Sequence, residues 1–141
     1  MKIKIFALTH KKFEVPQDKM YQPLQVGREE KEDLGYLCDN TGDNISAENC
    51  YYSELTGLYW IWKNVHTYKY VGTCHYRRYL LNEQEKIFTE AEYLELLKDY
   101  DLITTKRVVL NNSYHYGFAT NHNIHALDMT GEAVSYTHLT L

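Results

Sequence analysis

Basic side chains gather at three points of this sequence, each directly after a stretch with the pattern of a β-strand. The three segments are Thr9-His10-Lys11-Lys12, His75-Tyr76-Arg77-Arg78-Tyr79 and Lys106-Arg107. Arginine offers a planar fork of donors that matches phosphate oxygens, and positive charge suits a phosphate or pyrophosphate group. The competing interpretation is that these strands simply reach the surface and become polar where they end.

A second polar group lies in the segment Asp39-Asn40-Thr41-Gly42-Asp43-Asn44. Its side-chain oxygens could hold a ribose, the edge of a base or a divalent ion. An ordinary tight turn uses the same residue types, because Asp and Asn bond their own backbone and Gly tolerates a positive φ. Both interpretations stay open, and Asp39 and Asp43 are the candidate metal ligands by their chemistry.

Three further features carry weaker signals. Asp99-Tyr100-Asp101 spells D-x-D, a pattern that can carry a metal-bound sugar nucleotide, but it precedes a predicted strand and so lies away from the edge where ligands bind. His122 and His125 could share a helical face, although a metal site needs a third ligand. The chain has no G-x-x-x-x-G-K-[ST], G-x-G-x-x-G or G-x-S-x-G motif, which removes the main support for P-loop, dinucleotide-binding and α/β-hydrolase assignments.

Alternation and helical spacing predict the elements that position these residues. We expect strands at residues 2–8, 69–75 and 101–105, and no regular element between Thr9 and Asn49. Spacing in the segment 50–65 predicts a helix with Leu55, Leu58, Tyr59 and Trp62 on one buried stripe and Trp60 pointing elsewhere. Thr89 and Glu92 form a capping box, and the helix behind it repeats Tyr93, Leu96, Leu97 and Tyr100.

The order strand, helix, strand, helix, strand is typical of a parallel sheet, because parallel neighbours need a return element. We therefore predict an α/β, Rossmann-like, mostly parallel sheet with flanking helices. In such a sheet ligands bind beyond the carboxyl ends of the strands. The strand-end segments should then border one cleft together with the loop from Asp39 to Asn44.

Composition narrows the class of partner. The 141 residues suggest one domain, and the formal charge of −4 provides no general basic field for a nucleic acid polymer. Three cysteines without a C-x-x-C pair indicate neither a disulfide framework nor a thiolate zinc site, which fits a reducing, cytoplasmic compartment. No apolar run approaches the ~20 residues that cross a bilayer, so membrane association could only be peripheral or through a partner.

Five segments occur in the order of one known family. They are Ala7-Leu8-Thr9-His10-Lys11, Tyr21-Gln22-Pro23-Leu24-Gln25-Val26-Gly27, Asp39-Asn40-Thr41-Gly42-Asp43-Asn44-Ile45-Ser46, Glu54-Leu55-Thr56-Gly57-Leu58-Tyr59-Trp60-Ile61-Trp62-Lys63-Asn64 and Gly72-Thr73-Cys74-His75-Tyr76-Arg77-Arg78-Tyr79. Over residues 2 to about 132 the chain resembles the domain of unknown function 4422 family of capsular and exopolysaccharide biosynthesis proteins. That family is itself similar to GT-A glycosyltransferases.

The resemblance implies a glycosyltransferase that moves a sugar from a nucleotide-sugar donor to a bacterial capsular, exopolysaccharide or lipopolysaccharide glycan, at the inner face of the membrane. It also implies a divalent metal, Mn or Mg, although the D-x-D of many GT-A enzymes is missing after residues 69–75. The expected donor and phosphate site comprises Thr9, His10, Lys11, Asp39, Asn40, Gly42, Asp43, Asn44, His75, Arg77 and Arg78. A non-catalytic nucleotide- or carbohydrate-binding domain of a polysaccharide assembly complex is the alternative.

The end of the chain has a different character. Residues 134–141, Val-Ser-Tyr-Thr-His-Leu-Thr-Leu, carry no charged residue and no helix cap, and the first six of them match one reading frame of a transposase adapter used in shotgun library preparation. We therefore expect residues 1–133 to be the N-terminal part of a glycosyltransferase-like domain that is truncated at its C-terminus. Residues 134–141 would then be a non-native tail, and the catalytic base could lie in the lost portion.

Overall fold

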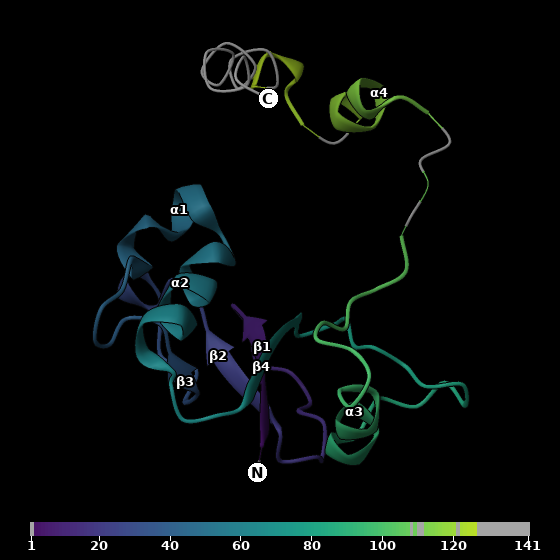
Figure 1. Cartoon of the computed structure of the whole chain (residues 1–141). Helices are drawn as coiled ribbons and strands as arrows, with labels where there is room; N and C mark the ends of the chain where they lie inside the picture. Colours follow the sequence, from purple (N-terminus) through teal and green to yellow (C-terminus); the bar gives the residue numbers. More distant parts are fainter. Residues whose placement is uncertain (1, 108, 110–111, 121, 127–141) are drawn as a thin grey trace, which may run out of the picture. The chain divides into compact units, whose positions relative to one another are not determined.

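A computed structural model describes residues 2–107, 109, 112–120 and 122–126 (Figure 1). The chain divides into two compact units, Met1–Ile103 and Thr104–Leu141. The first unit contains a four-stranded sheet with helices on both faces. The described part of the second unit contains the helix α4 (Tyr114–Ala119), which begins at the Ser113 cap. The expected tail, residues 134–141, and the proposed break near Ala133 lie outside the described residues.

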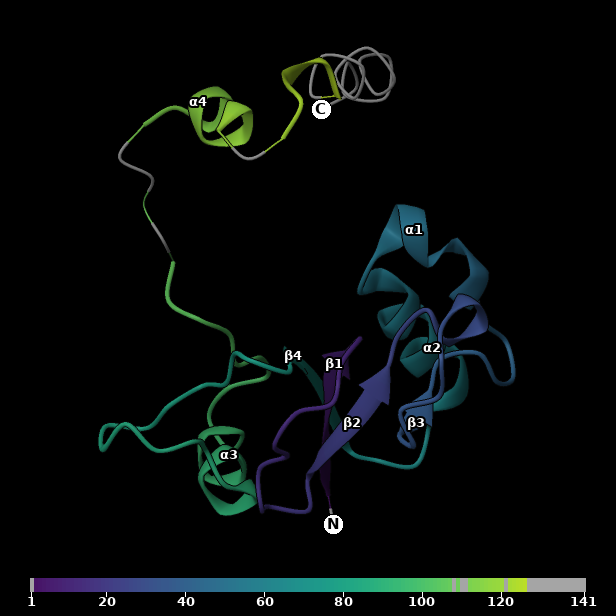
Figure 2. The same cartoon turned by 180° about the vertical axis from the view of Figure 1, so that it is seen from behind.

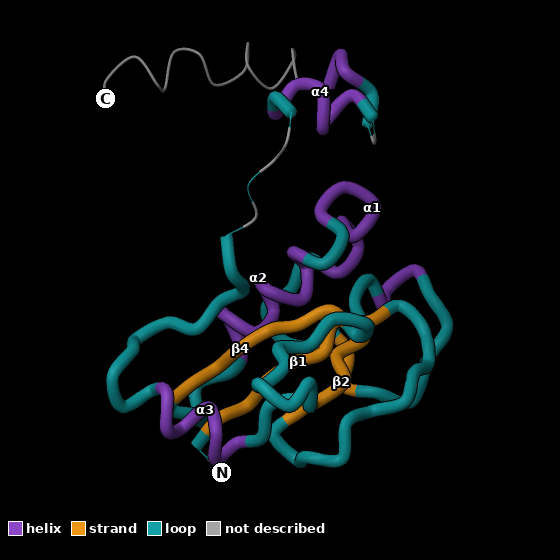
Figure 3. The backbone as a smooth tube through the Cα atoms, turned by 90° about the vertical axis from the view of Figure 1, so that its right-hand side faces the viewer, coloured by secondary structure: helices purple, strands orange, loops and turns teal. Residues whose placement is uncertain are grey.

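The sheet has the order β3-β2-β1-β4, and every neighbouring pair is parallel. Figure 3 shows β4, β1 and β2 side by side. Its strands are β1 (Ile3–Thr9), β2 (Tyr21–Gln25), β3 (Leu37–Cys38) and β4 (Tyr70–His75). The α/β parallel architecture predicted from the sequence is confirmed. The strands expected at 2–8 and 69–75 correspond to β1 and β4.

The expectation of no regular element between Thr9 and Asn49 is wrong, because β2 and β3 both lie there. Pro23 obscures the pattern of β2, since proline lacks the N–H that a central strand needs. The structure tolerates Pro23 because β3 is short and pairs only with Leu24 and Gln25. At Pro23 the strand therefore has a hydrogen-bonded neighbour on one side, β1, where it lies opposite Ala7.

The strand expected at residues 101–105 is also absent, and the described sheet ends at β4. Ile103 packs against the core beside Ile3, Ile5 and Tyr93, so an apolar residue of that segment is used for packing. A β-strand needs a neighbouring strand to accept and donate its backbone hydrogen bonds. The alternating pattern of residues 101–105 cannot show whether such a neighbour is present.

Two apolar clusters cover the two faces of β1, whose seven residues are all buried. On one face Phe6 and Leu8 pack with Trp60 and Ile61 of the helix α2 (Leu55–Asn64). On the other, Ile3 and Ile5 pack with residues that include Tyr93 of α3 (Glu90–Leu96). Figures 1 and 2 show α2 and α3 on opposite sides of the strands. The α3 helix begins with the predicted capping box of Thr89 and Glu92, which is confirmed.

The helix expected over residues 50–65 is divided into α1 (Asn49–Tyr52) and α2, preceded by the 3-10 turn η2 (Ser46–Glu48). The break falls at Ser53, whose φ of 49° ends α1. The expected inward stripe is wrong: Leu55, Leu58 and Trp62 are exposed, Trp62 by 67%. Instead the residues that α2 buries are Thr56, Gly57, Trp60 and Ile61.

Gly57 explains which face of α2 meets the sheet. A Cβ at this position would lie 2.7 Å from Cγ1 of Val26 and 2.9 Å from Cδ2 of Leu8. The small residue thus lets the helix approach the strands closely, and Trp60 then lies one turn further along the same face, edge-on to Phe6. The spacing of large apolar residues indicated a different face, because a hydrophobic pattern counts large apolar side chains and glycine has none.

Candidate functional site

The carboxyl edge of the sheet collects the residues that sequence analysis selected. All four strands are parallel, so the segments Thr9–Lys11, Asp39–Asn44 and His75–Arg78 follow strands that end at this one edge. The strand order places β3 and β4 at opposite ends of the row. With strands about 4.8 Å apart, the loop after β3 and the turn after β4 are separated by roughly 14 Å. The edge therefore has two regions with different neighbours.

A buried tyrosine, Tyr76, joins the ends of β1 and β4. Its backbone N–H donates to the carbonyl of Leu8 at 3.1 Å, and its side chain is only 8% exposed. The rings of His10 and Phe13 each lie 5.6 Å from the Tyr76 ring, and the Arg77 guanidinium lies 5.1 Å from it. Tyr76 thus brings His10 and Arg77, which are 67 positions apart in the numbering, against one rigid ring.

His10 stands among basic groups. Desolvation by burial lowers the pKa of His10, and the charges of Lys11, Lys31, His75 and Arg77 lower it further, in that order. All four charged neighbours that shift this pKa are basic. We name these five residues the basic cluster: His10, Lys11, Lys31, His75 and Arg77. Positive groups held together in this way attract an anion, which would relieve their mutual repulsion.

His75 uses both nitrogens of its ring within the protein. Nδ1 accepts a hydrogen bond from the backbone N–H of Arg77 at 3.2 Å, and Nε2 lies 3.4 Å from Oε1 of Glu54. The His75 carbonyl accepts from the backbone N–H of Arg78 at 2.8 Å. Its side chain is 14% exposed. His75 therefore shapes the turn that carries the two arginines, both of which are exposed.

Thr9 plays a comparable part at the end of β1. Its buried hydroxyl donates to the carbonyl of Lys11 at 2.6 Å and accepts from the N–H of Lys11 at 3.0 Å. These two bonds close a turn that leaves the side chains of His10 and Lys11 exposed. Thr9 thus fixes the backbone turn that carries two members of the basic cluster, His10 and Lys11.

Lys31 is the member of the basic cluster that sequence analysis missed. It follows η1 (Arg28–Glu30), and its Nζ donates to Oδ1 of Asn49 at 2.7 Å. In the sequence Lys31 belongs to a mixed run of charges, Arg28-Glu29-Glu30-Lys31-Glu32-Asp33, which has the pattern of an ordinary solvated loop. The signal that would have found it is β2, because Lys31 lies in the connection that leaves the carboxyl end of that strand.

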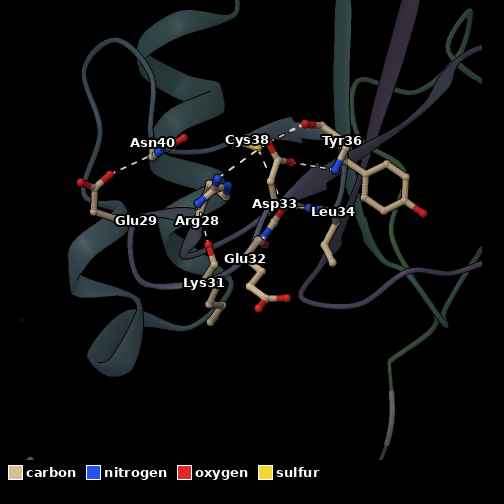
Figure 4. Close-up of polar contacts among 11 residues, drawn as sticks. Arg28, Glu29, Lys31, Glu32, Asp33, Leu34, Tyr36, Cys38 and Asn40 are labelled. Atoms are coloured by element: carbon tan, nitrogen blue, oxygen red, sulfur yellow. Dashed lines mark hydrogen bonds and ion pairs between the residues drawn. The ribbon is translucent and has the colours of Figure 1, made fainter.

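A network of polar contacts holds this connection in shape, as Figure 4 shows. The buried amide of Gln25 donates to the carbonyl of Glu32 at 2.7 Å and accepts from the N–H of Leu34 at 2.9 Å. The guanidinium of Arg28 donates to the carbonyl of Lys31 and lies 3.7 Å from Oδ2 of Asp33. The backbone that presents Lys31 is consequently fixed at several points.

The strand after this connection, β3, contains Cys38, whose thiol lies near the carbonyl of Tyr36. Burial raises the pKa of Cys38, and burial raises the pKa of Cys74 to about 12. Both thiols therefore stay protonated at neutral pH, and a thiolate nucleophile at either position is disfavoured.

Asp39 is fully buried, and protein donors satisfy both of its carboxylate oxygens. Oδ1 accepts from the N–H of Arg28 at 3.1 Å and from the hydroxyl of Ser46 at 2.6 Å. Oδ2 accepts from the N–H of Gly27 at 2.9 Å and from the hydroxyl of Thr56 at 2.7 Å. Gly27 adopts a φ of 64°, which turns the chain so that successive amides meet this carboxylate. Asp39 ties three segments together and presents no exposed surface to a ligand.

The rest of this loop is anchored on α2. The Tyr59 hydroxyl donates to Asp43 Oδ1 at 3.0 Å, and Asn64 bonds both the N–H and the carbonyl of Asp43. Trp60 donates from Nε1 to the carbonyl of Thr41 at 2.8 Å. The remaining expected site residues contact their own loop or its neighbours: Asn44 donates to the Gly42 carbonyl, and Asn40 donates to Glu29.

The weaker candidates lie elsewhere. Asp101 lines an open cavity of about 240 Å³ together with Ile3 and Tyr70 from the beginnings of β1 and β4, which places it toward the amino edge of the sheet. In the second unit, the His122 ring lies 4.9 Å from that of Phe118. Over the residues that the structure describes, no group of three His, Cys, Asp or Glu side chains is placed to hold a metal ion.

Comparisons with known proteins agree with this architecture. The family model "Domain of unknown function (DUF4422)" matches residues 4–140. No curated protein matches the chain. One solved structure, the WbbM bifunctional glycosyltransferase in its apo form, is 42% identical over 57% of this chain, with a TM-score of 0.53. The match covers 14% of that longer chain, so this protein corresponds to a small part of its structural relative.

The first unit is thus an α/β fold similar to part of a glycosyltransferase, with a basic cluster at the carboxyl edge of its sheet. No helix among the described residues is both long and apolar enough to cross a membrane. Because the family model spans nearly all of the sequence, the chain belongs to the family described as Domain of unknown function (DUF4422).

Proposed function

We propose that this chain binds a nucleotide-sugar donor and takes part in transferring the sugar to a bacterial capsular, exopolysaccharide or lipopolysaccharide glycan. The observation that carries the proposal is the basic cluster, in which four positively charged or titratable groups surround His10 at the carboxyl edge. This is the edge where open α/β sheets bind nucleotides. The 42% identity to a glycosyltransferase supplies independent support for the class of reaction.

The donor's diphosphate fits the basic cluster. When the acceptor hydroxyl attacks the anomeric carbon, the bond between that carbon and the phosphate oxygen breaks, and the bonding electron pair leaves with the nucleoside diphosphate. Charge therefore builds up on the diphosphate oxygens. Lys11, Lys31 and Arg77 would stabilise that charge from backbone positions that hydrogen bonds already fix.

The residues expected to hold Mn or Mg do not fit a metal ion. Asp39 is fully buried and already accepts four hydrogen bonds, and Asp43 is engaged by Tyr59 and by Lys63, whose Nζ lies 3.8 Å away. The basic cluster provides the compensating charge that a metal supplies in other transferases. We therefore derive no step through a metal.

Calorimetric titration of the 141-residue protein with uridine, guanosine, cytidine and thymidine diphosphates tests the proposal. At least one should bind, and Arg77→Ala should weaken that nucleotide about tenfold to a hundredfold, because a hydrogen bond to a charged group is lost. Lys69→Ala is the matched control: it removes the same charge at the opposite, amino edge of the sheet, directly before β4. Its affinity should equal that of the unaltered protein.

A second measurement separates transferase from binding domain. The matching nucleotide sugar is incubated with the protein, and release of nucleoside diphosphate is followed over time. Release that depends on Arg77 supports the transferase, whereas binding without any release favours a nucleotide-binding domain of a polysaccharide assembly complex. Absence of binding to all four nucleotides would refute the proposed function. Since nucleotide sugars are cytosolic metabolites, the proposal also implies a cytoplasmic protein, at the inner face of the membrane when it serves a membrane-bound glycan.

A further inference from the structure

His75 and Glu54 form a pair at the carboxyl edge that the proposed diphosphate contacts do not use. Glu54 immediately precedes α2, yet its side chain makes no capping hydrogen bond to that helix. Its carboxylate instead lies 3.4 Å from Nε2 of His75 across the gap between α2 and the end of β4. Glu54 is half-exposed, whereas His75 is largely buried. The pair therefore links a helix start to a strand end.

The tautomer of the neutral His75 ring follows from its contacts. A backbone N–H donates to Nδ1, so Nδ1 carries no proton. In the neutral ring the proton then resides on Nε2, which lies 3.4 Å from the Glu54 carboxylate. The opposite tautomer would break the Nδ1 hydrogen bond and leave Nε2 without a proton beside that carboxylate.

We propose that His75 is a positioning residue of the diphosphate site, whose Nδ1 holds the Arg77 backbone while Glu54 fixes the ring. This inference rests on the proposed function, and it gives His75 a different role from the direct phosphate contact expected from the sequence. The Nδ1 bond and the bond from the Arg78 N–H to the His75 carbonyl close a tight turn. That turn, together with the Tyr76 ring, sets where the Arg77 guanidinium lies.

Two substitutions at position 75 isolate the Nδ1 contact. In His75→Asn the side-chain oxygen occupies the place of Nδ1 and still accepts from Arg77. In His75→Gln the polar atoms lie further out, near the place of Nε2, and the Arg77 N–H loses its acceptor. Both variants remove the imidazole and any charge that it carries, so the difference between them reports the hydrogen bond.

Calorimetry with inorganic pyrophosphate and uridine diphosphate should show His75→Asn within about threefold of the unaltered protein and His75→Gln weakened about tenfold. Combining His75→Gln with Arg77→Ala should weaken binding little more than Arg77→Ala alone, because both changes disable the same guanidinium. Equal losses in the two His75 variants would overturn the proposal, since they would mean that the imidazole contacts the anion directly.

Glu54 offers a second matched pair. Glu54→Gln and Glu54→Ala remove the same negative charge, but only glutamine keeps a side-chain oxygen near Nε2. The alanine variant should bind pyrophosphate about two- to threefold more weakly than the glutamine variant. Identical affinities would show that the carboxylate does not orient the ring.

Amide hydrogen exchange at Arg77 distinguishes a failure of this inference from a failure of the proposed function. The Arg77 amide should be protected in the unaltered protein and in His75→Asn, and should exchange faster in His75→Gln. If none of the proteins binds either probe or any of the other three nucleoside diphosphates, the proposed function is refuted, and the exchange rates still decide whether His75 holds the turn. Equal exchange in all three proteins would refute the positioning role, whatever the binding results.

Discussion

The two ends of the carboxyl edge contain similar residue types and use them in opposite ways. Beside β3, the carboxylates of Asp39 and Asp43 accept hydrogen bonds from other side chains of the protein. Beside the ends of β1, β2 and β4, the basic cluster keeps its basic groups close together, and burial together with the other four members lowers the pKa of His10. The loop after β3 is thus built to hold the fold together, whereas the basic cluster is built to receive an anion.

The largest expected effect is on the structural side of this comparison. Asp39→Ala leaves two buried hydroxyls and two backbone N–H groups without their acceptor, so the free energy of unfolding should fall by about 3 to 5 kcal/mol. Asp43→Ala in the same loop is the control and should change it by no more than about 0.5 kcal/mol, because Asp43 is exposed. Urea unfolding followed by circular dichroism measures both. Equal losses of unfolding free energy in the two variants would show that Asp39 contributes no more to stability than Asp43.

A smaller effect is expected where the loop is fixed to α2. Trp60→Phe removes the donor that satisfies the Thr41 carbonyl and leaves part of the buried indole volume empty, which should cost about 1 to 2.5 kcal/mol. Trp62→Phe alters a side chain that is 67% exposed and should cost less than about 0.5 kcal/mol. Thermal and urea unfolding measure both losses. A larger loss of unfolding free energy in Trp62→Phe than in Trp60→Phe would contradict the account.

These two tryptophans also show how far the sequence could predict the fold. The helical period was correct, but the large residues Leu55, Leu58 and Trp62 indicated the wrong face. The inward face was marked instead by Gly57, whose role depends on its closeness to Val26, the residue directly after β2. Patterns within a segment predict an element, whereas its orientation depends on packing that no single segment contains.

For the candidate site, too, local patterns predicted some residues, whereas others depended on the tertiary structure. The strand-end rule predicted the segments around His10 and Arg77, because β1 and β4 have clear strand patterns. Lys31 could not be found, since the proline in β2 hid the strand that places it. Burial decides the role of Asp39, and a turn-like sequence such as Asp39–Asn44 is compatible with either a ligand site or a structural hub.

Lys31 provides a prediction on the binding side. Lys31→Ala should weaken uridine diphosphate binding about fivefold to tenfold, because one charge of the basic cluster is lost, with little change in the unfolding midpoint. Lys31→Arg should retain most of the affinity. Calorimetry at two salt concentrations adds a check, since the loss in Lys31→Ala should shrink as salt screens the cluster. An affinity unaffected by Lys31→Ala would confine the anion site to β1 and β4.

The smallest effect is a pH dependence of stability that belongs to the basic cluster. Because the pKa of His10 is lowered in the folded protein, the unfolded chain binds more protons in the interval between the lowered value and about 6.5. His10 therefore reduces stability as the pH falls through that interval, and stability returns as the pH rises above it. Urea unfolding at pH 5.5 and 7.5 should show a smaller difference in His10→Asn than in the unaltered protein, and an unchanged difference would contradict this.

The most direct test of the central claim is the pKa of His10 measured by NMR with and without uridine diphosphate. In the free protein the titration should have its midpoint below about 6.5, since burial and four basic neighbours disfavour the imidazolium. Bound diphosphate would place negative charge among those neighbours, so saturation with the nucleotide should move the midpoint upward. A midpoint that stays unchanged at saturating nucleotide would show that the diphosphate binds elsewhere and would contradict the account.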